Sequence, residues 1–327
     1  MELIDKYHQF GIIDSCNFRI PLHSDKIRLI HLCKIKTEID RATAEEIRNS
    51  GYLKNLAVSW NSDNATVYGS FAKYYFGNNL NLLTLNQYKI VTSDLSEKLG
   101  IDISLAKIFQ LDNAFDAEVA LPVKSYFNLF GEKKGMMRTP TDRNSLYYSN
   151  SFKIVNIYDK LKDLKHDGMI VTGIENLMRE NLMRFEVRNK TAAIAKIIKM
   201  FGLTELTIAD LRRRDIFSEF VRAVLKEYQS IAKKQDFYFD GNIRKPNDII
   251  TPLAIAGINS IGLENVYSMI ENTRALKKLK HNEYYSRMKN KVRGLSKHKD
   301  YTRPYPALTD LDNEMKLIEN LSLRWVF

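Results

Sequence analysis

The chain has 327 residues, of which 44% are apolar and 27% charged, and these ordinary globular values exclude a disordered, collagen-like or low-complexity chain. Fifty Lys and Arg residues outnumber 39 Asp and Glu residues, and the net charge of +11 favours a polyanionic partner, nucleic acid before an anionic membrane surface. Cys16 and Cys33 are too few for a disulfide framework and form no CxxC pair, so we expect an intracellular protein. With no apolar run of 18 residues and no leader-like start, neither a membrane span nor secretion is expected.

Alternation of apolar and polar residues with a period of two predicts strands in the first half of the chain. A short helix is also expected over residues 93–99, where Ser93 lies near an N-cap position. The predicted strands cover residues 26–35, 65–74, 106–114, 151–160 and 182–188.

Helical spacing of apolar residues replaces this alternation after Asn189. One long amphipathic segment begins at Thr207, which forms a capping-box pattern with Asp210. The fold class predicted is therefore α+β, with an antiparallel β-sheet domain over residues 1–190 and an all-helical basic domain over residues 191–327. The predicted helices cover residues 191–201, 207–232, 248–258, 263–273, 281–295 and 311–323.

The positive charge is concentrated in one helical segment. Residues 274–303 contain eleven Lys and Arg against two acidic residues, so they carry +9 of the net +11. This favours a surface that binds DNA, and residues 251–293 are candidates for a helix-turn-helix whose last helix contacts the duplex. A solvated basic helix face is the alternative. The predicted DNA-binding residues here are Lys277, Lys278, Lys280, Arg287, Lys289, Lys291 and Arg293.

Three of the predicted strands place reactive polar side chains on a single face, because alternate residues of a strand point the same way. If the strands are neighbours, carboxylates, a tyrosine and cations line one sheet surface. The alternative is a solvent-exposed sheet face with cross-strand ion pairs. The residues that share a face are Gln110, Asp112 and Asp116 in the first strand, Asn156, Tyr158 and Lys160 in the second, and Arg184, Glu186 and Arg188 in the third.

Four segments, in order, resemble motifs of rolling-circle replication initiators, above all the gene II/X family of filamentous phages and plasmids. They are GSFAKYYFGNN (69–79), QLDNAFD (110–116), NIYDK (156–160) and LMRFEVR (182–188), so the resemblance covers about residues 65–190. The chain departs from the family at Gln110, where a basic residue is usual. It also lacks the His-x-His pair with which the wider HUH nucleases bind their metal.

The resemblance implies an enzyme that nicks and rejoins origin DNA through a 5′-phosphotyrosine, with Tyr158 as the nucleophile. A tyrosine hydroxyl has a pKa of ~10, so it needs a nearby cation to favour the phenolate, and Lys160 is placed for this role. No ATP is required, because the phosphotyrosine conserves the energy of the cut bond. Other tyrosines near the motifs, such as Tyr147, are candidates for a second nucleophile.

A divalent cation is expected to neutralise the charge that develops on the phosphate. The candidate ligands are Asp112, Glu186 and Asp116, and an all-oxygen ligand set suits Mg²⁺ or Mn²⁺.

Further residues of the resembling segments are expected to contact DNA. Arg184 and Arg188 flank Glu186 and are candidates for bidentate phosphate contacts. Ser70, in a pair of small residues with Gly69, would let a DNA backbone approach closely, and Lys73 and Asn79 are candidates for contacts with phosphate or base; a structural turn at this segment is the alternative.

The expected partners are single-stranded and duplex origin DNA, with a host helicase or polymerase as a further candidate, in the cytoplasm of a bacterial host. The oligomeric state stays open. A non-enzymatic DNA-binding protein explains the basic helices but not the reactive sheet face. A tyrosine recombinase would need a late nucleophile such as Tyr301 or Tyr305, and both lie close to prolines.

Overall fold

The structure is a computed structural model of the full chain. It describes residues 11–22, 27–40, 42–43, 46–140, 145–166, 181–237, 244–278, 280–297 and 302–324.

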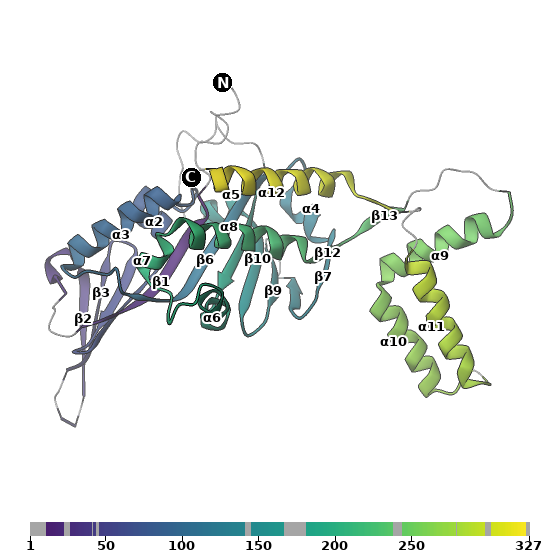
Figure 1. The fold of residues 1–327 in the computed structure, drawn as a ribbon, viewed down its shortest axis with the longest axis horizontal. Helices are drawn as coiled ribbons and strands as arrows, with labels where there is room; N and C mark the ends of the chain where they lie inside the picture. Colours follow the sequence, from purple (N-terminus) through teal and green to yellow (C-terminus); the bar gives the residue numbers. More distant parts are fainter. Residues whose placement is uncertain are drawn as a thin grey trace, which may run out of the picture. The chain divides into compact units, whose positions relative to one another are not determined.

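A ten-stranded antiparallel sheet forms the framework (Figure 1). Strands β2 to β5 form a meander at one end, and β1 joins it to β6, β11, β10, β9 and β8 in that order. The bounds are β1 Ile13–Pro21, β2 Cys33–Ile39, β3 Glu46–Leu53, β4 Leu56–Trp60, β5 Asn64–Tyr68, β6 Lys107–Glu118, β8 Met137–Pro140, β9 Ser145–Ser149, β10 Lys153–Asp159 and β11 Leu182–Asn189. Two short pairs stand apart from it, β7 Phe130–Lys133 with β12 Ile231–Lys233, and β13 Gln235–Phe237 with β14 Thr302–Pro304.

The helices up to α5 lie between strands of the sheet in the sequence, and the later helices fill most of the last third of the chain. They are η1 Leu29–His31, α2 Phe71–Phe76, α3 Leu85–Leu99, α4 Val123–Phe127, α5 Lys160–His166, α6 Thr191–Met200, α7 Ile208–Leu211, α8 Arg214–Gln229, α9 Asn247–Ile261, α10 Leu263–Ala275, α11 Asn282–Ser296 and α12 Pro306–Arg324. This mixture of an antiparallel sheet with C-terminal helices confirms the predicted α+β class.

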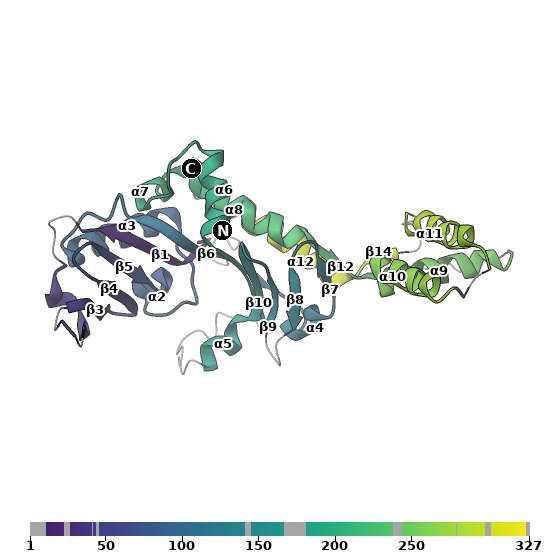
Figure 2. The ribbon, with the colours of Figure 1, turned by 90° about the horizontal axis from the view of Figure 1, so that it is seen from below.

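The two faces of the sheet are different. One face carries the apolar residues of the central strands and packs against α8, where Asn113 donates a hydrogen bond to the Phe220 carbonyl and the ring of Phe185 meets that of Tyr228 at 5.5 Å. Figure 2 shows α6 and α8 on one side of the central strands and α5 on the other. The second face carries the polar residues and holds the candidate site.

The chain divides into two compact units. The first comprises residues 1–128, 132–231 and 311–327, and the second comprises residues 129–131 and 232–310. This division differs from the one expected at residue 190, because α6, α7 and α8 belong to the unit that contains the sheet. Their apolar faces are the reason, since they bury side chains such as Ile194 and Phe220 in its core.

Several predicted elements change their bounds or type. The predicted strand over 65–74 ends at Tyr68, because the Ser70 hydroxyl accepts the Lys73 N–H at 3.0 Å and so caps α2. The expected helix over 93–99 begins earlier, at a capping box formed by Thr84 and Gln87. The predicted Thr207–Asp210 capping box is present, although the helix it starts is the single turn α7 and not the longer α8.

Helices α9, α10 and α11 pack on one another within the second unit. Helices α9 and α10 are bent by 96° at Gly262. In the described part of the chain no single helix has the length and apolarity of a membrane span, and only this bent pair reaches both together.

Candidate active site

Neighbouring strands β6, β11 and β10 bring the predicted site residues onto one face of the sheet. In the ladder Asp112 lies opposite Arg188, Asp116 opposite Arg184, and Arg184 opposite Tyr158. Residues directly opposite each other in an antiparallel pair share a face. The period-two reading of these three segments therefore describes their real arrangement.

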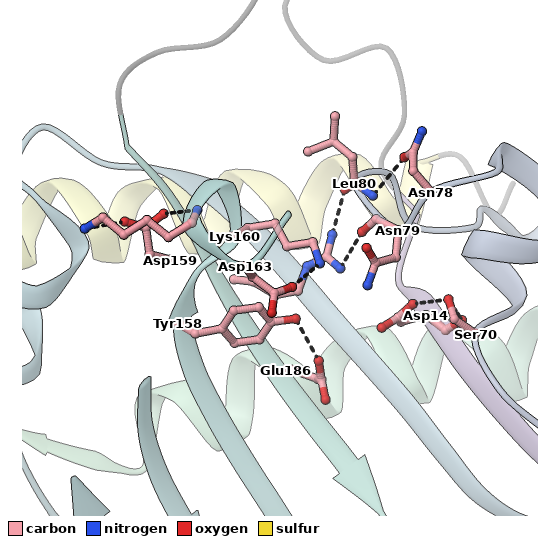
Figure 3. A network of polar contacts seen from close by, with 12 residues as sticks. Asp14, Ser70, Asn78, Asn79, Leu80, Tyr158, Asp159, Lys160, Asp163 and Glu186 are labelled. Atoms are coloured by element: carbon pink, nitrogen blue, oxygen red, sulfur yellow. Dashed lines mark hydrogen bonds and ion pairs between the residues drawn. The ribbon is translucent and has the colours of Figure 1, made fainter. Parts of the chain in front are cut away.

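Tyr158 is almost completely buried, with 7% of its surface exposed. Its hydroxyl donates a hydrogen bond to Glu186 Oε2 at 3.1 Å (Figure 3). Burial raises the pKa of Tyr158 well above its ordinary value, Arg184 opposes this rise, and Glu186 adds to it. The tyrosine is therefore a neutral phenol held by a carboxylate.

Lys160 lies beside this ring but is already engaged. It is the first residue of α5, its side chain is fully buried, and Nζ lies 5.6 Å from the centroid of the Tyr158 ring. Nζ also donates to Asp163 Oδ2 at 2.8 Å. Burial, and then the nearby Arg184, lower the pKa of Lys160. Arg184 is thus the stronger electrostatic support for a phenolate at Tyr158.

Arg184 is fully buried and holds a network of its own. Its Nε and one NH₂ group each contact one oxygen of Asp116 at 2.6 Å, a bidentate ion pair. The remaining contacts go to the carbonyls of Asn79 and Leu80, at 2.8 and 2.7 Å. Arg184 therefore positions the segment around Asn79, and Asp116 acts as its counter-ion in this arrangement.

Arg188 bridges two other carboxylates. Its Nε lies 3.0 Å from Asp112 Oδ2, and a terminal nitrogen lies 3.5 Å from Glu186 Oε1. Gln110, the position that departs from the family pattern, donates to Asp112 Oδ1 at 3.2 Å. Unlike Arg184, the Arg188 side chain is 40% exposed, so it can reach a ligand above the sheet.

A third carboxylate, Asp14, belongs to the same site, and the sequence did not indicate it. It lies on β1 at a β-bulge, where Ile13 pairs with Asn113 but Ser15 pairs with Asp112. Its carboxylate accepts a hydrogen bond from the Ser70 hydroxyl at 2.7 Å. No strand was predicted over β1, and a bulged residue breaks the alternation that would have revealed it.

The three carboxylates repel one another. Burial, followed by the charges of Asp14 and Asp112, raises the pKa of Glu186 to about 7. Burial also raises the pKa of Asp112 to about 6, against the opposing effect of Arg188 and with a contribution from Asp14. Such an excess of negative charge at one buried place favours a cation.

The oxygen donors of the site are chemically suited to a divalent cation. The side-chain oxygen of Asn156, directly across the ladder from Glu186, is buried and accepts no hydrogen bond from any described residue. Carboxylate and amide oxygens match Mg²⁺ or Mn²⁺. Within the described ranges, however, no three Asp, Glu, His or Cys residues stand close enough to hold a metal ion as they are. Of the three predicted ligands, Asp112 and Glu186 share the Arg188 guanidinium, whereas Asp116 contacts Arg184.

The segment upstream of α3 forms one edge of the site. The Ser70 hydroxyl donates a hydrogen bond to the Asp14 carboxylate and accepts one from the Lys73 N–H in the first turn of α2. It therefore links this turn to β1. Lys73 lies in the same turn and is half-buried. The Asn79 side-chain oxygen is buried and has no partner among the described residues.

The predicted basic residues lie in the second unit. Lys277, Lys278 and Lys280 are exposed in the connection between α10 and α11. On α11, Arg287 pairs with Glu283, and Lys289 pairs with Glu271 of α10. Lys291 and Arg293 are exposed on the same helix. Tyr301 and part of the basic segment around it lie outside the described residues.

Comparison with known proteins gives a solved structure that can be set beside this fold. It is the rolling circle replication initiator protein from Geobacillus stearothermophilus, with 13% sequence identity and a TM-score of 0.35, over 71% of this chain and 90% of that one. No protein-family profile matches the chain, and no curated protein matches it by sequence.

Proposed function

We propose that this chain is a DNA nicking and joining enzyme of the rolling-circle initiator type, with Tyr158 as its nucleophile. One observation carries the proposal: the Tyr158 hydroxyl lies on a buried sheet face, bonded to Glu186 and within the field of Arg184. A plain structural tyrosine would not need two arginines and three carboxylates around it. The order of the motifs along the sequence supports the same reading.

The proposed reaction is an in-line displacement at a backbone phosphate. The Tyr158 oxygen forms a bond to phosphorus while its proton passes to Glu186 Oε2, 3.1 Å away. The bond from phosphorus to the 3′-oxygen breaks, and that oxygen takes a proton from water. A later 3′-hydroxyl reverses the same steps and reseals the strand.

The cations of the site have separate tasks in this proposal. Arg184, held rigidly by Asp116, stabilises negative charge on the Tyr158 oxygen. Arg188 is exposed enough to leave its carboxylates and contact the phosphate.

A Mg²⁺ or Mn²⁺ ion would be held by Asp112 and Glu186, and we add Asp14 to the proposed ligands because it lies in the same carboxylate group. Bound there, it would neutralise charge on the phosphate. Asp116 is less suitable as a ligand, because both of its oxygens already contact Arg184.

The test is a covalent-adduct assay. Single-stranded oligonucleotides of random sequence, labelled at the 3′ end, are incubated with the full chain and Mn²⁺ or Mg²⁺, and the products are separated on a denaturing protein gel. We expect a labelled adduct that Tyr158→Phe abolishes. Tyr147→Phe is the matched control, since Tyr147 lies on the adjacent strand β9 opposite Asn156, and it should keep the adduct.

Two results would contradict the proposal. An adduct that persists in Tyr158→Phe would assign the nucleophile elsewhere. DNA binding without any adduct, with either metal, would favour the alternative of a non-enzymatic DNA-binding protein that uses the basic helices.

A further inference from the structure

A pocket of about 450 Å³ lies on the sheet at the end formed by β1, β3, β4 and β5. Two arginines, Arg19 and Arg48, and two aromatic residues, Trp60 and Tyr68, are among the residues that line it. The remaining lining residues are neutral, so no carboxylate is part of the wall. The pocket therefore combines positive charge with ring surfaces.

The pocket arginines are available to a ligand. Arg19 and Arg48 are both exposed, and neither forms an ion pair with any described residue. Arg48 has one hydrogen bond, to the Ser59 hydroxyl at 2.6 Å, which holds it at the pocket wall. Two other exposed arginines of the same unit do have acidic partners: Arg213 contacts Asp215 at 2.6 Å, and Arg222 lies 3.8 Å from Glu219.

This pocket opens on the same face of the sheet as the candidate active site. Along β1 the side chains of Ser15, Asn17 and Arg19 alternate onto one face, and Ser15 lies opposite Asp112 while Arg19 lies opposite Thr66 in the pocket wall. Helix α8 packs against the other face at β6 and β11. A single strand of DNA lying across the face with the pocket would reach both the pocket and the candidate active site.

A second bulge places an aromatic ring against Tyr68, one of the residues that line the pocket. Asn17 of β1 pairs with Gln110 of β6, and the next residue, Phe18, pairs with Ile108. Strand β6 therefore has one extra residue here, Phe109. A bulged residue leaves the normal alternation, and the Phe109 ring packs edge-on against Tyr68 with centroids 5.6 Å apart. Phe109 directly precedes Gln110, the residue that contacts Asp112. Tyr68 itself is 39% exposed although it has this aromatic neighbour.

We propose that this pocket is a binding subsite for single-stranded DNA, in which a base stacks on Tyr68 and the adjoining phosphates contact Arg19 and Arg48. Exposed rings take unstacked bases of any sequence, and arginines at the rim neutralise the backbone. Duplex DNA presents no free base faces to such a wall. The proposal deepens the proposed function, on which it rests for the identity of the ligand.

The distance of the subsite from the candidate active site determines which part of a bound DNA strand it would hold. Ser15 and Arg19 are four residues apart on one strand, which corresponds to about 13 Å at ~3.3 Å per residue. Tyr158 lies on β10, which β6 and β11 separate from β1, so the subsite would hold bases several nucleotides from the phosphate that Tyr158 attacks.

The test measures binding without cleavage. The full chain carrying Tyr158→Phe is titrated into a fluorescein-labelled oligodeoxythymidine of 20 nucleotides, and anisotropy is followed from 50 to 200 mM salt. Tyr68→Ala should weaken binding about tenfold, within the range for one lost stacking contact. Tyr68→Phe, which keeps the ring, should bind as the parent does.

The arginines have their own signature in the same titration. Arg19→Ala should lower the slope of log K against log salt by about 0.7, the value for one lost phosphate contact on a single strand, and Arg19→Lys should restore it. Arg222→Ala is the matched control on α8, and it should change neither affinity nor slope. Quenching of tryptophan fluorescence on DNA addition should disappear in Trp60→Phe.

The outcomes separate the two proposals. Unchanged affinity and slope in both Tyr68→Ala and Arg19→Ala would overturn the subsite, even if the wild-type chain forms the covalent adduct. Equal competition by a 20-base-pair duplex would overturn the assignment to single strands. Loss of binding in these variants, combined with no adduct in the wild type, would support the subsite and refute the proposed nicking activity.

Discussion

The ion pair between Asp116 and Arg184 makes a sharp prediction about stability. Arg184 is 0% exposed, and both Asp116 oxygens contact it at 2.6 Å. Removing one partner of a buried pair costs ~3–5 kcal/mol, because a desolvated charge is left without its counter-ion. Arg184 would keep its bonds to two carbonyls, so we expect the lower value, about 3 kcal/mol, for Asp116→Ala.

This loss is large enough to measure by thermal unfolding. For a unit of this size each kcal/mol corresponds to ~2–4 °C, so the midpoint should fall by about 6–12 °C. Tryptophan fluorescence is a suitable signal, because Trp60 and Trp325 both lie outside residues 232–310 of the second unit. The experiment is done in EDTA, so that no metal ion contributes.

The matched control is Asp215→Ala. Asp215 contacts Arg213 at the same 2.6 Å, but the two side chains are 53% and 46% exposed. Solvent screens such a pair, and its loss should barely move the midpoint. An unchanged midpoint for Asp116→Ala in EDTA would refute the reasoning, and it would favour the original assignment of Asp116 as a metal ligand.

Three further results are expected. Glu227→Ala should destabilise the chain by about 3 kcal/mol in urea unfolding, because Lys133, whose side chain is 4% exposed, loses its counter-ion. Without metal, the free energy of unfolding should fall as the pH rises from about 4.5 to 7. The reason is that folded Glu186, with its pKa raised to about 7, holds a proton that the unfolded chain has already released. For one such group the free energy of unfolding changes by at most ~1.4 kcal/mol per pH unit. With Ellman's reagent, exposed Cys33 should react in the native chain and buried Cys16 only after unfolding, because burial and Asp112 raise the pKa of its thiol.

Each of these has a variant that can contradict it. Lys153→Met leaves the Lys133–Glu227 pair intact and should cost less than Glu227→Ala; an equal cost would mean that the buried charge is not the cause. Glu186→Gln should flatten the fall in stability between pH 4.5 and 7, and an unchanged fall would place the titrating group elsewhere. Rapid labelling of Cys33→Ser before unfolding would show that Cys16 is accessible.

The polar face of the sheet was predictable because its strands alternate regularly. Arg184, Glu186 and Arg188 follow one another at intervals of two residues, and Gln110 and Asp112 have the same spacing on their strand. Period two is a geometric property of the strand, so it needs no knowledge of the partner strands. Which partner each charge takes depends on the register, and the sequence does not reveal that Asp116 faces Arg184.

The features that the sequence did not reveal are those where a local exception overrides periodicity. Residues 69–74 alternate like a strand, yet the Ser70 hydroxyl caps a helix there. Asp14 sits in a bulge, and bulges leave no pattern in a single sequence. The compact units differ from the expected division because basic charge marks the second unit well, whereas the packing of α6 and α8 depends on apolar faces that resemble those of any helix.

The two bulges between β1 and β6 cancel each other. β1 has one extra residue at Asp14 and β6 has one at Phe109, so the pairing of Ile13 with Asn113 and that of Phe18 with Ile108 belong to the same register. Only the short stretch between them is shifted by one residue. A chain lacking both residues would have an unbroken ladder, but neither the Asp14 carboxylate nor the Phe109 ring that packs against Tyr68. The sheet thus has irregular pairing at two places, and deleting these two residues would remove both side chains while leaving the register of the flanking strand segments unchanged.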